Sequence, residues 1–130
     1  MEYYFNKTIG NTPFEKAVEK TKLALQEEGF GVLTEIDMKA TLKKKLDVDF
    51  YNYTVLGACN APFAHKALQA EDKIGTMLPC NVIVMEKEPG LVEIAAVNPM
   101  ASMQAVINLD LMNIADEVGE KLKRVVEKIH

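Results

Sequence analysis

The chain has few of the residues on which common catalytic sites depend. Its 130 residues include one serine, two histidines, two cysteines and no tryptophan. Ser102 is not in a Gly-x-Ser-x-Gly turn, so we expect no serine nucleophile. His65 and His130 alone cannot form a histidine-rich metal centre, and no glycine-rich phosphate-binding motif is present. These absences favour a protein that is not an enzyme of a common class, and the sequence requires no cofactor.

The chain also lacks a net positive charge and long apolar runs. The net charge of −4 argues against a nucleic-acid partner, since nucleic-acid binders carry a basic patch. No apolar run approaches the roughly 18 residues that a bilayer requires, so we expect no membrane partner. Residues 1–7 lack the basic and apolar regions of a signal peptide. We therefore expect a cytoplasmic protein, in which Cys59 and Cys80 are not a structural disulfide.

Hydrophobic patterning predicts one domain over residues 1–130 with strands and helices interleaved. Alternating apolar, aromatic and β-branched residues predict five strands, the last two forming a hairpin around Glu88-Pro89-Gly90. Three-to-four spacing of apolar residues predicts the helices. The strands are expected at 3–8, 30–36, 50–58, 80–87 and 91–97, and the helices at 13–28, 38–46, 61–71, 99–103 and 111–129. This order indicates an α+β fold with a five-stranded, mainly antiparallel sheet and helices packed against it.

Helix starts and stops can be assigned from single residues. Thr12, before Pro13, is expected to cap the first helix, and Gly29 to end it. Asp37 is placed to cap the second helix. Asn60, before Ala61 and Pro62, is expected to cap the third.

Two cysteine–asparagine pairs mark the most distinctive segments of the chain. They are Tyr53-Thr-Val-Leu-Gly-Ala-Cys-Asn-Ala-Pro62 and Leu78-Pro-Cys-Asn-Val-Ile-Val84, with Ala64-His-Lys-Ala-Leu-Gln-Ala70 between them. With these three segments the chain resembles the domain of unknown function 302 family over essentially its whole length. The resemblance implies a compact α+β fold, a homodimer and no established activity.

The cysteines are the first candidates for chemistry. Cys59 is expected at the end of a strand and just before a helix, where the helix dipole would lower the pKa of its thiol. Cys80 begins the next strand, and His65 lies six residues after Cys59. Two thiolates and an imidazole are ligands for zinc or cuprous copper, although their spacing matches no metal-binding motif. In the alternative interpretation both cysteines are small buried packing residues and His65 lies on the surface.

Polar and aromatic residues give further candidates. Asn81 is unusual near the start of an apolar strand, so its amide is expected to bond a loop backbone or to face a ligand. Met100 and Met103 share one face of a short predicted helix, where they pack in the core or line a pocket. Tyr51 and Tyr53 share a strand face that becomes a subunit interface or a pocket wall if no helix covers it.

Two functions of different class remain open. The first is a binding or interaction module for a small molecule or protein, with its pocket between Cys59-Asn60-Ala61-Pro62 and Leu78-Pro79-Cys80-Asn81. The second is a thiol-dependent protein that handles redox equivalents, sulfur or a soft metal, with Cys59 reactive and Cys80 as its partner.

Overall fold

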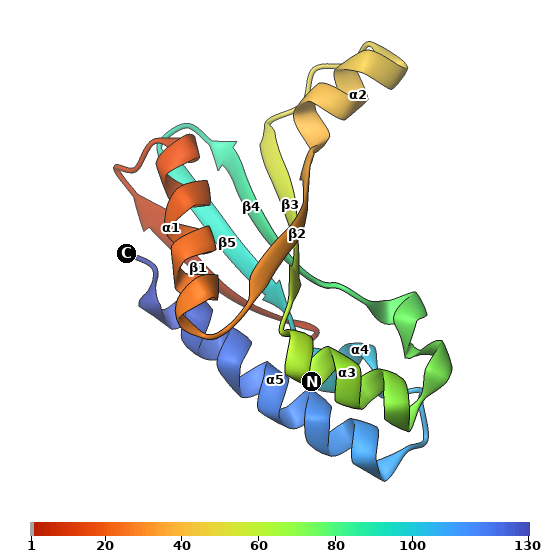
Figure 1. Cartoon of the computed structure of the whole chain (residues 1–130). Coiled ribbons are helices and arrows are strands. Elements are labelled where there is room, and N and C mark those ends of the chain that lie inside the picture. The colour runs from red at the N-terminus through yellow and green to blue at the C-terminus, as the bar shows by residue number, and fades with distance from the viewer. Residues whose placement is uncertain (1) are drawn as a thin grey trace.

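A five-stranded antiparallel sheet forms the centre of the molecule (Figure 1). The computed structural model describes residues 2–130. The strands lie in the order β1-β5-β4-β3-β2, and every neighbouring pair is antiparallel. Their bounds are β1 Tyr4–Gly10, β2 Gly31–Asp37, β3 Asn52–Cys59, β4 Cys80–Glu88 and β5 Leu91–Val97. The predicted α+β fold and its five strands are therefore confirmed.

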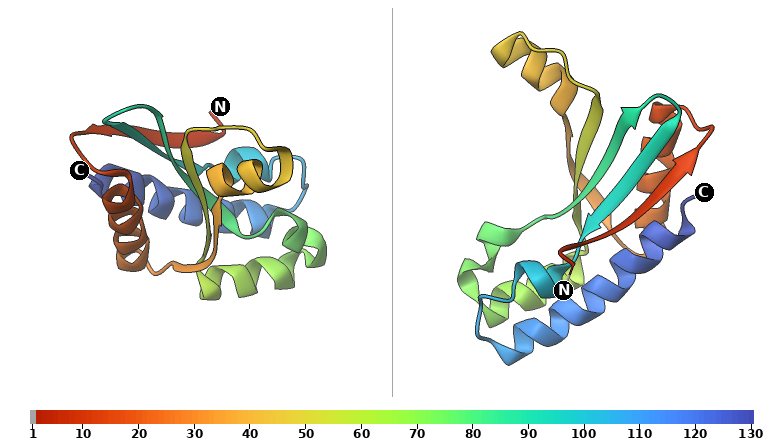
Figure 2. Two further views of the ribbon diagram at one scale, coloured as in Figure 1. Left: turned by 90° about the horizontal axis from the view of Figure 1, so that it is seen from above. Right: turned by 180° about the vertical axis from the view of Figure 1, so that it is seen from behind.

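The helices are distributed unevenly around the sheet. Their bounds are α1 Phe14–Glu27, α2 Met38–Leu46, α3 Ala61–Ala70, the 3₁₀ helix η1 Asp72–Met77, α4 Pro99–Ser102 and α5 Leu109–Lys128. Helices α1 and α5 cover one face, α3 and α4 gather against the first half of α5, and α2 projects beyond the end of the sheet (Figure 2). Within residues 2–130, no helix is both long enough and apolar enough to cross a membrane.

The main core lies between the sheet and the pair α1 and α5. Alternate strand residues point inward, and α5 contributes the apolar stripe expected from its sequence. The fully buried members include Leu25, Leu56, Val82, Val84, Val92, Ile94, Leu122 and Val125. A second, smaller cluster joins α3, η1, α4 and the start of α5, with Ile74 and Leu111 fully buried.

The turn that ends α1 follows its sequence closely. Gly29 has a positive φ of 85°, and its N–H donates to the Gln26 carbonyl. The N–H of Phe30 donates to the Leu25 carbonyl, which completes a Schellman motif. The predicted cap at the other end is wrong: Pro13 occupies the cap position, and the Thr12 hydroxyl donates to the Gly10 carbonyl instead.

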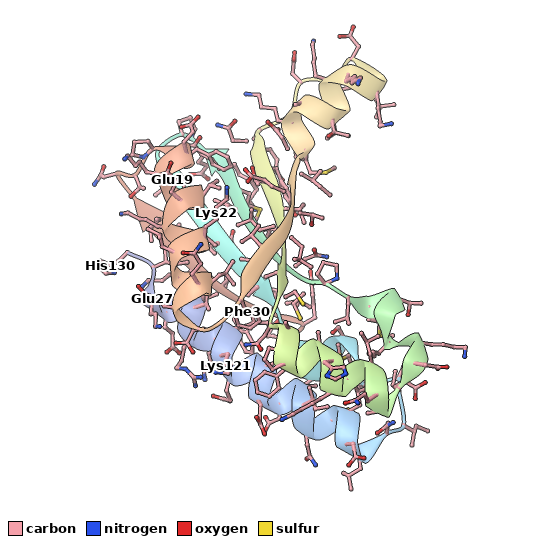
Figure 3. The ribbon with its side chains drawn as sticks, viewed as in Figure 1. Glu19, Lys22, Glu27, Phe30, Lys121 and His130 are labelled. Carbon is pink, nitrogen blue, oxygen red and sulfur yellow. The ribbon has the colours of Figure 1, made fainter. Side chains whose placement is uncertain are left out.

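Glu28 joins the end of α1 to α5. Its carboxylate accepts hydrogen bonds from Lys128 Nζ at 2.6 Å and Arg124 Nε at 3.1 Å, and its side chain is only 11% exposed. The Lys128 hydrogen bond lowers the pKa of Glu28, partial burial opposes that shift, and Arg124 adds to it. Glu27, at the last turn of α1 (Figure 3), also reaches Lys128 at 3.3 Å but is 63% exposed.

We expect Glu28→Gln to lower the free energy of unfolding at neutral pH by about 1–2 kcal/mol, because it removes charged hydrogen bonds. The pKa of Glu28 is lowered in the folded chain, so its contribution is complete above the ordinary value of 4.5 and is lost below it. Urea unfolding of wild type and variant at several pH values measures the contribution of Glu28 to the free energy of unfolding. The difference between wild type and variant should shrink at acid pH, and Glu27→Gln should cost less than about 0.5 kcal/mol. Equal costs for both variants would contradict the account.

Candidate functional site

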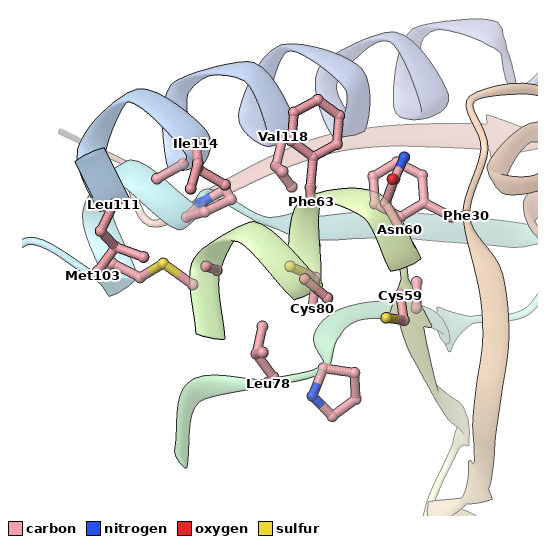
Figure 4. Close-up of a pocket in the computed structure, with 16 residues that line it drawn as sticks. Phe30, Cys59, Asn60, Phe63, Leu78, Cys80, Met103, Leu111, Ile114 and Val118 are labelled. Atoms are coloured by element: carbon pink, nitrogen blue, oxygen red, sulfur yellow. The ribbon is translucent and has the colours of Figure 1, made fainter. Parts of the chain in front are cut away.

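An apolar pocket lies where the ends of two strands meet α3 and α5 (Figure 4). Its cavity has a volume of about 40 Å³. Carbon and sulfur atoms form nearly all of its wall, and among the lining residues within 2–130 Asn60 alone has a side-chain amide. The lining residues are Phe30, Ala58, Cys59, Asn60, Phe63, Ala64, Ala67, Leu78, Pro79, Cys80, Pro99, Met103, Leu111, Ile114, Ala115 and Val118.

The antiparallel pairing of β3 and β4 brings the two cysteines to one place. Ala58 is directly opposite Cys80 in the register, so Cys59 is one residue away from that pair. The chain leaves β3 at Cys59, runs through α3 and η1, and returns through Leu78 and Pro79, whose peptide bond is cis. Both thiols therefore line the same pocket despite the 21 positions between them.

The two thiols differ in exposure and in acidity. Cys80 is 8% exposed, whereas Cys59 is partly exposed, and neither forms a disulfide. Burial, with a smaller contribution from the nearby Cys59 thiol, raises the pKa of Cys80 to about 11. Cys80 is thus a neutral thiol at physiological pH and acts as a wall of the pocket rather than as a thiolate.

Asn60 is in the cap position of α3, but its side chain does not cap the helix. Its amide nitrogen lies 3.4 Å from the Glu28 carbonyl oxygen, and so it ties the start of α3 to the end of α1. The predicted capping role is wrong: the Asn60 side chain accepts no hydrogen bond from the first turn of α3, and its amide nitrogen donates to the Glu28 carbonyl instead. The result is that Asn60 stands beside Phe30, at the side of the pocket formed by the α1–β2 turn.

Asn81 and His65 lie outside the pocket. Strand alternation turns the exposed Asn81 away from Cys80 and onto the sheet face that α1 and α5 leave open. His65 is exposed on α3 and is not among the lining residues. Throughout residues 2–130, no three His, Cys, Asp or Glu side chains come close enough together to hold a metal ion. The candidate ligands Cys59, His65 and Cys80 are therefore not assembled as a three-residue site.

Several pocket residues could not be assigned to it from the sequence. Met103 was expected in the core or in a pocket, and it lines this one, whereas Met100 does not. Ile114 and Val118 carried only the general signal of an amphipathic helix, and their place depends on how α5 crosses α3. Phe63 stands at the border, where Lys66 Nζ and Lys121 Nζ lie 5.6 and 5.9 Å from its ring centre.

Tyr51 and Tyr53 belong to an aromatic cluster near the start of β3. The ring of Tyr51 stacks on Phe50 at a centre-to-centre distance of 4.1 Å, and lies 6.1 Å from that of Tyr53. Burial, with smaller effects of Tyr51 and other neighbours, raises the pKa of the Tyr53 phenol. The side chains of Tyr53 and Asn81 lie on the same, helix-free face of the sheet, away from the pocket.

Comparisons with known proteins agree with this architecture. A crystal structure of the uncharacterized conserved protein DUF302 from Bacillus stearothermophilus is similar, with a TM-score of 0.86 and 26% identity over 97% of this chain and 98% of that one. An uncharacterized protein of Aquifex aeolicus (strain VF5) is 28% identical over 94 residues; the match covers 72% of this chain but 59% of that protein. The family model described as "Domain of unknown function DUF302" matches residues 5–129. The chain therefore belongs to the DUF302 family.

Proposed function

We propose that the chain is a binding module whose ligand places a small apolar group in the pocket between α3 and α5. The single observation that supports this most is the pocket wall, which is apolar but leaves a cavity of about 40 Å³. Drug-sized ligands need pockets of about 300 Å³ or more. The cavity is therefore suited to a few carbon atoms, such as the end of a short alkyl chain, with the rest of the ligand outside.

The border of the pocket favours a negative charge on the outer part of the ligand. The ammonium groups of Lys66 and Lys121 lie 5.6 and 5.9 Å from the ring centre of the border residue Phe63. No carboxylate is among the lining residues. The ligand class that suits this arrangement is a small amphiphile with an apolar end and an anionic head.

A series of straight-chain alkanoates from propanoate to octanoate tests the proposal. We expect the affinity to rise about fourfold for each added methylene group until the cavity is full, and then to level off. The methyl resonance of ¹³C-labelled Met103, a buried lining residue, should report binding. Alkanols of the same length should bind less tightly because they lack the charge.

Ala64→Leu is the decisive variant because Ala64 lines the cavity and a leucine side chain would fill it. We expect Ala64→Leu to abolish binding while the protein stays folded, as circular dichroism should confirm. Ala61→Leu is the matched control, since Ala61 is exposed on the same helix and does not line the cavity. An alkanoate that bound Ala64→Leu as well as wild type would rule out this pocket.

The thiol-dependent alternative is carried by one observation, that Cys59 and Cys80 line the same pocket. In that function the partly exposed Cys59 reacts and the neutral Cys80 is its partner. The two functions differ in what replacement of the cysteines does. Cys59→Ser and Cys80→Ser should leave alkanoate binding largely intact in a binding module and abolish activity in a thiol-dependent protein.

We also infer that the protein works in the cytoplasm as a homodimer. The family resemblance implies the dimer, and the helix-free face of the sheet offers a surface for it. A reducing compartment suits two free thiols that are not joined.

A further inference from the structure

The face of the sheet opposite α1 and α5 is apolar and carries no helix; on it Tyr53, Val55, Ile83 and Val97 are half-buried and Ala95 is buried. Val55, Ile83 and Ala95 lie side by side across β3, β4 and β5, because each is opposite the next in the register. Tyr53 and Val97 point to the same side by strand alternation. Within residues 2–130, no helix packs on this side of the central strands (Figure 2). We call these five residues the open face.

A second surface without a partner is the segment 38–51, which we call the α2 arm. Helix α2 has nine residues and none of them is buried. Leu46 is 65% exposed, and Val48, in the following link, is 42% exposed. A helix shorter than about 12 residues is marginal in water without tertiary packing. The α2 arm extends past the sheet and lies on the side of β2 and β3 away from α1 (Figure 2), which is the side of the open face.

We propose that the open face and the α2 arm together form the interface with a second copy of this chain. This inference rests on the proposed homodimer and names the surface that makes it. Each copy lays its open face against that of the other, and each α2 arm then flanks its partner.

The size of the two surfaces favours this arrangement. Each of the five strands has seven to nine residues, so the helix-free side of the sheet, which contains the open face, measures about 24 Å by about 19 Å, or about 450 Å² if flat. A stable interface buries about 800 Å² on each partner. The open side alone is too small, and the α2 arm supplies the additional area. A two-fold axis gives the two copies identical contacts. Each open face then packs on the other open face, and each α2 arm lies beside the other copy.

The chemistry of the open side is also compatible with a partner of the same kind. A hollow of about 170 Å³, lined mainly by carbon atoms of residues that include Tyr4, Ile83 and Val97, is large enough for a partner's side chain. The charges of the two surfaces are also partly complementary. The last turn of α2 carries Lys43, which pairs with Asp47 and Asp49 in the same arm, and the lysines Lys44 and Lys45. The β4–β5 end of the helix-free side carries Glu88 and Glu93 beside Lys87, so two acidic groups there face one basic group.

Sedimentation equilibrium of the full chain tests the inference. We expect wild type to have twice its monomer mass of 14.5 kDa at micromolar concentration. Ile83→Lys buries an unpaired charge at the centre of the open face and should raise the dimer dissociation constant by at least about 100-fold. Leu46→Lys, on the α2 arm, should raise it about tenfold. The control Leu23→Lys changes an equally apolar residue, 59% exposed on α1, and should leave it unchanged.

The outcomes separate this inference from the dimer itself. A monomeric wild type would overturn both the homodimer and the interface inferred for it. A dimer that Ile83→Lys does not weaken would leave the homodimer standing and overturn the open face as its surface. A dimer weakened by Ile83→Lys but not by Leu46→Lys would overturn the role of the α2 arm. If the circular dichroism spectrum shows that Ile83→Lys is unfolded, Ile83→Thr is measured instead. Threonine has a high strand preference and should still weaken the dimer about tenfold.

Discussion

Gly57→Ala is expected to lower the free energy of unfolding by about 2–3 kcal/mol, because a β-carbon has no room at this position. An added β-carbon would collide with the Thr34 hydroxyl on β2 and would lie 2.8 Å from Cγ of Pro79. Pro79 belongs to the segment that carries Leu78 and Cys80 into the pocket wall. The variant should therefore also weaken alkanoate binding, although no ligand touches residue 57.

Urea unfolding and the alkanoate titration together measure this effect. The double variant Thr34→Ala/Gly57→Ala should recover only part of the lost stability, because it removes the hydroxyl and leaves the proline ring in place. Gly90→Ala is not a suitable control, since Gly90 has a positive φ of 84°. Gly10→Ala is suitable, because its nearest neighbour is Cδ2 of Leu91 at 3.8 Å. A Gly57→Ala protein as stable as wild type would show that β2, β3 and the Pro79 segment do not pack as described.

Cys80 is expected to react with iodoacetamide at least about 100-fold more slowly at pH 8 in the native protein than in the unfolded chain. Its pKa is raised from 9.0 to about 11, so the thiolate is about 100-fold scarcer at neutral or mildly alkaline pH. The thiolate is the nucleophile, and the 8% exposure of the side chain slows the reaction further. Mass spectrometry of the Cys59→Ala variant follows Cys80 alone. A native rate close to that of the unfolded chain would contradict the buried position of this thiol.

The raised pKa of Cys80 also makes the free energy of unfolding change with pH in the alkaline range. The raised pKa of Cys80 in the folded state means that its contribution is complete below 9.0 and is lost as the pH rises through about 11. The expected loss is up to about 3 kcal/mol, since each unit of pKa corresponds to about 1.4 kcal/mol. In Cys80→Ala the free energy of unfolding should decline less steeply than in wild type between pH 9.0 and about 11. Parallel declines in the two proteins would assign the pH dependence to other groups.

The sequence predicted the sheet and the helices well because their signals are local. Alternation in residues 91–97 and the three-to-four spacing of Leu111, Val118, Leu122 and Val125 depend only on neighbours in the chain. Asp37 accepts from the Ala40 N–H, as its position before α2 indicated. The caps expected of Thr12 and Asn60 do not form: Pro13 takes the cap position of α1, and the Asn60 amide nitrogen donates to a carbonyl 32 positions away.

The pocket was predictable only in part. One of the two functional hypotheses placed a pocket between the Cys59–Pro62 turn and the Leu78–Asn81 segment, but the sequence did not show whether the two cysteines approach each other. The register of β3 and β4 brings Cys59 and Cys80 to the same pocket. Asn81 was grouped with them, but strand alternation sends it to the open side. The far wall, with Met103, Ile114 and Val118, comes from helices whose packing no local pattern specifies.

A crystal of the protein under xenon pressure tests the central claim most directly. Xenon is apolar and small enough for a cavity of about 40 Å³, and it enters such cavities without needing a polar partner. The account predicts a xenon atom between α3 and α5, in contact with side chains that include Phe63, Cys80 and Met103. It also predicts that the atom is absent from Ala64→Leu. A wild-type pocket without xenon, or xenon bound equally in Ala64→Leu, would contradict the claim that this cavity receives an apolar ligand.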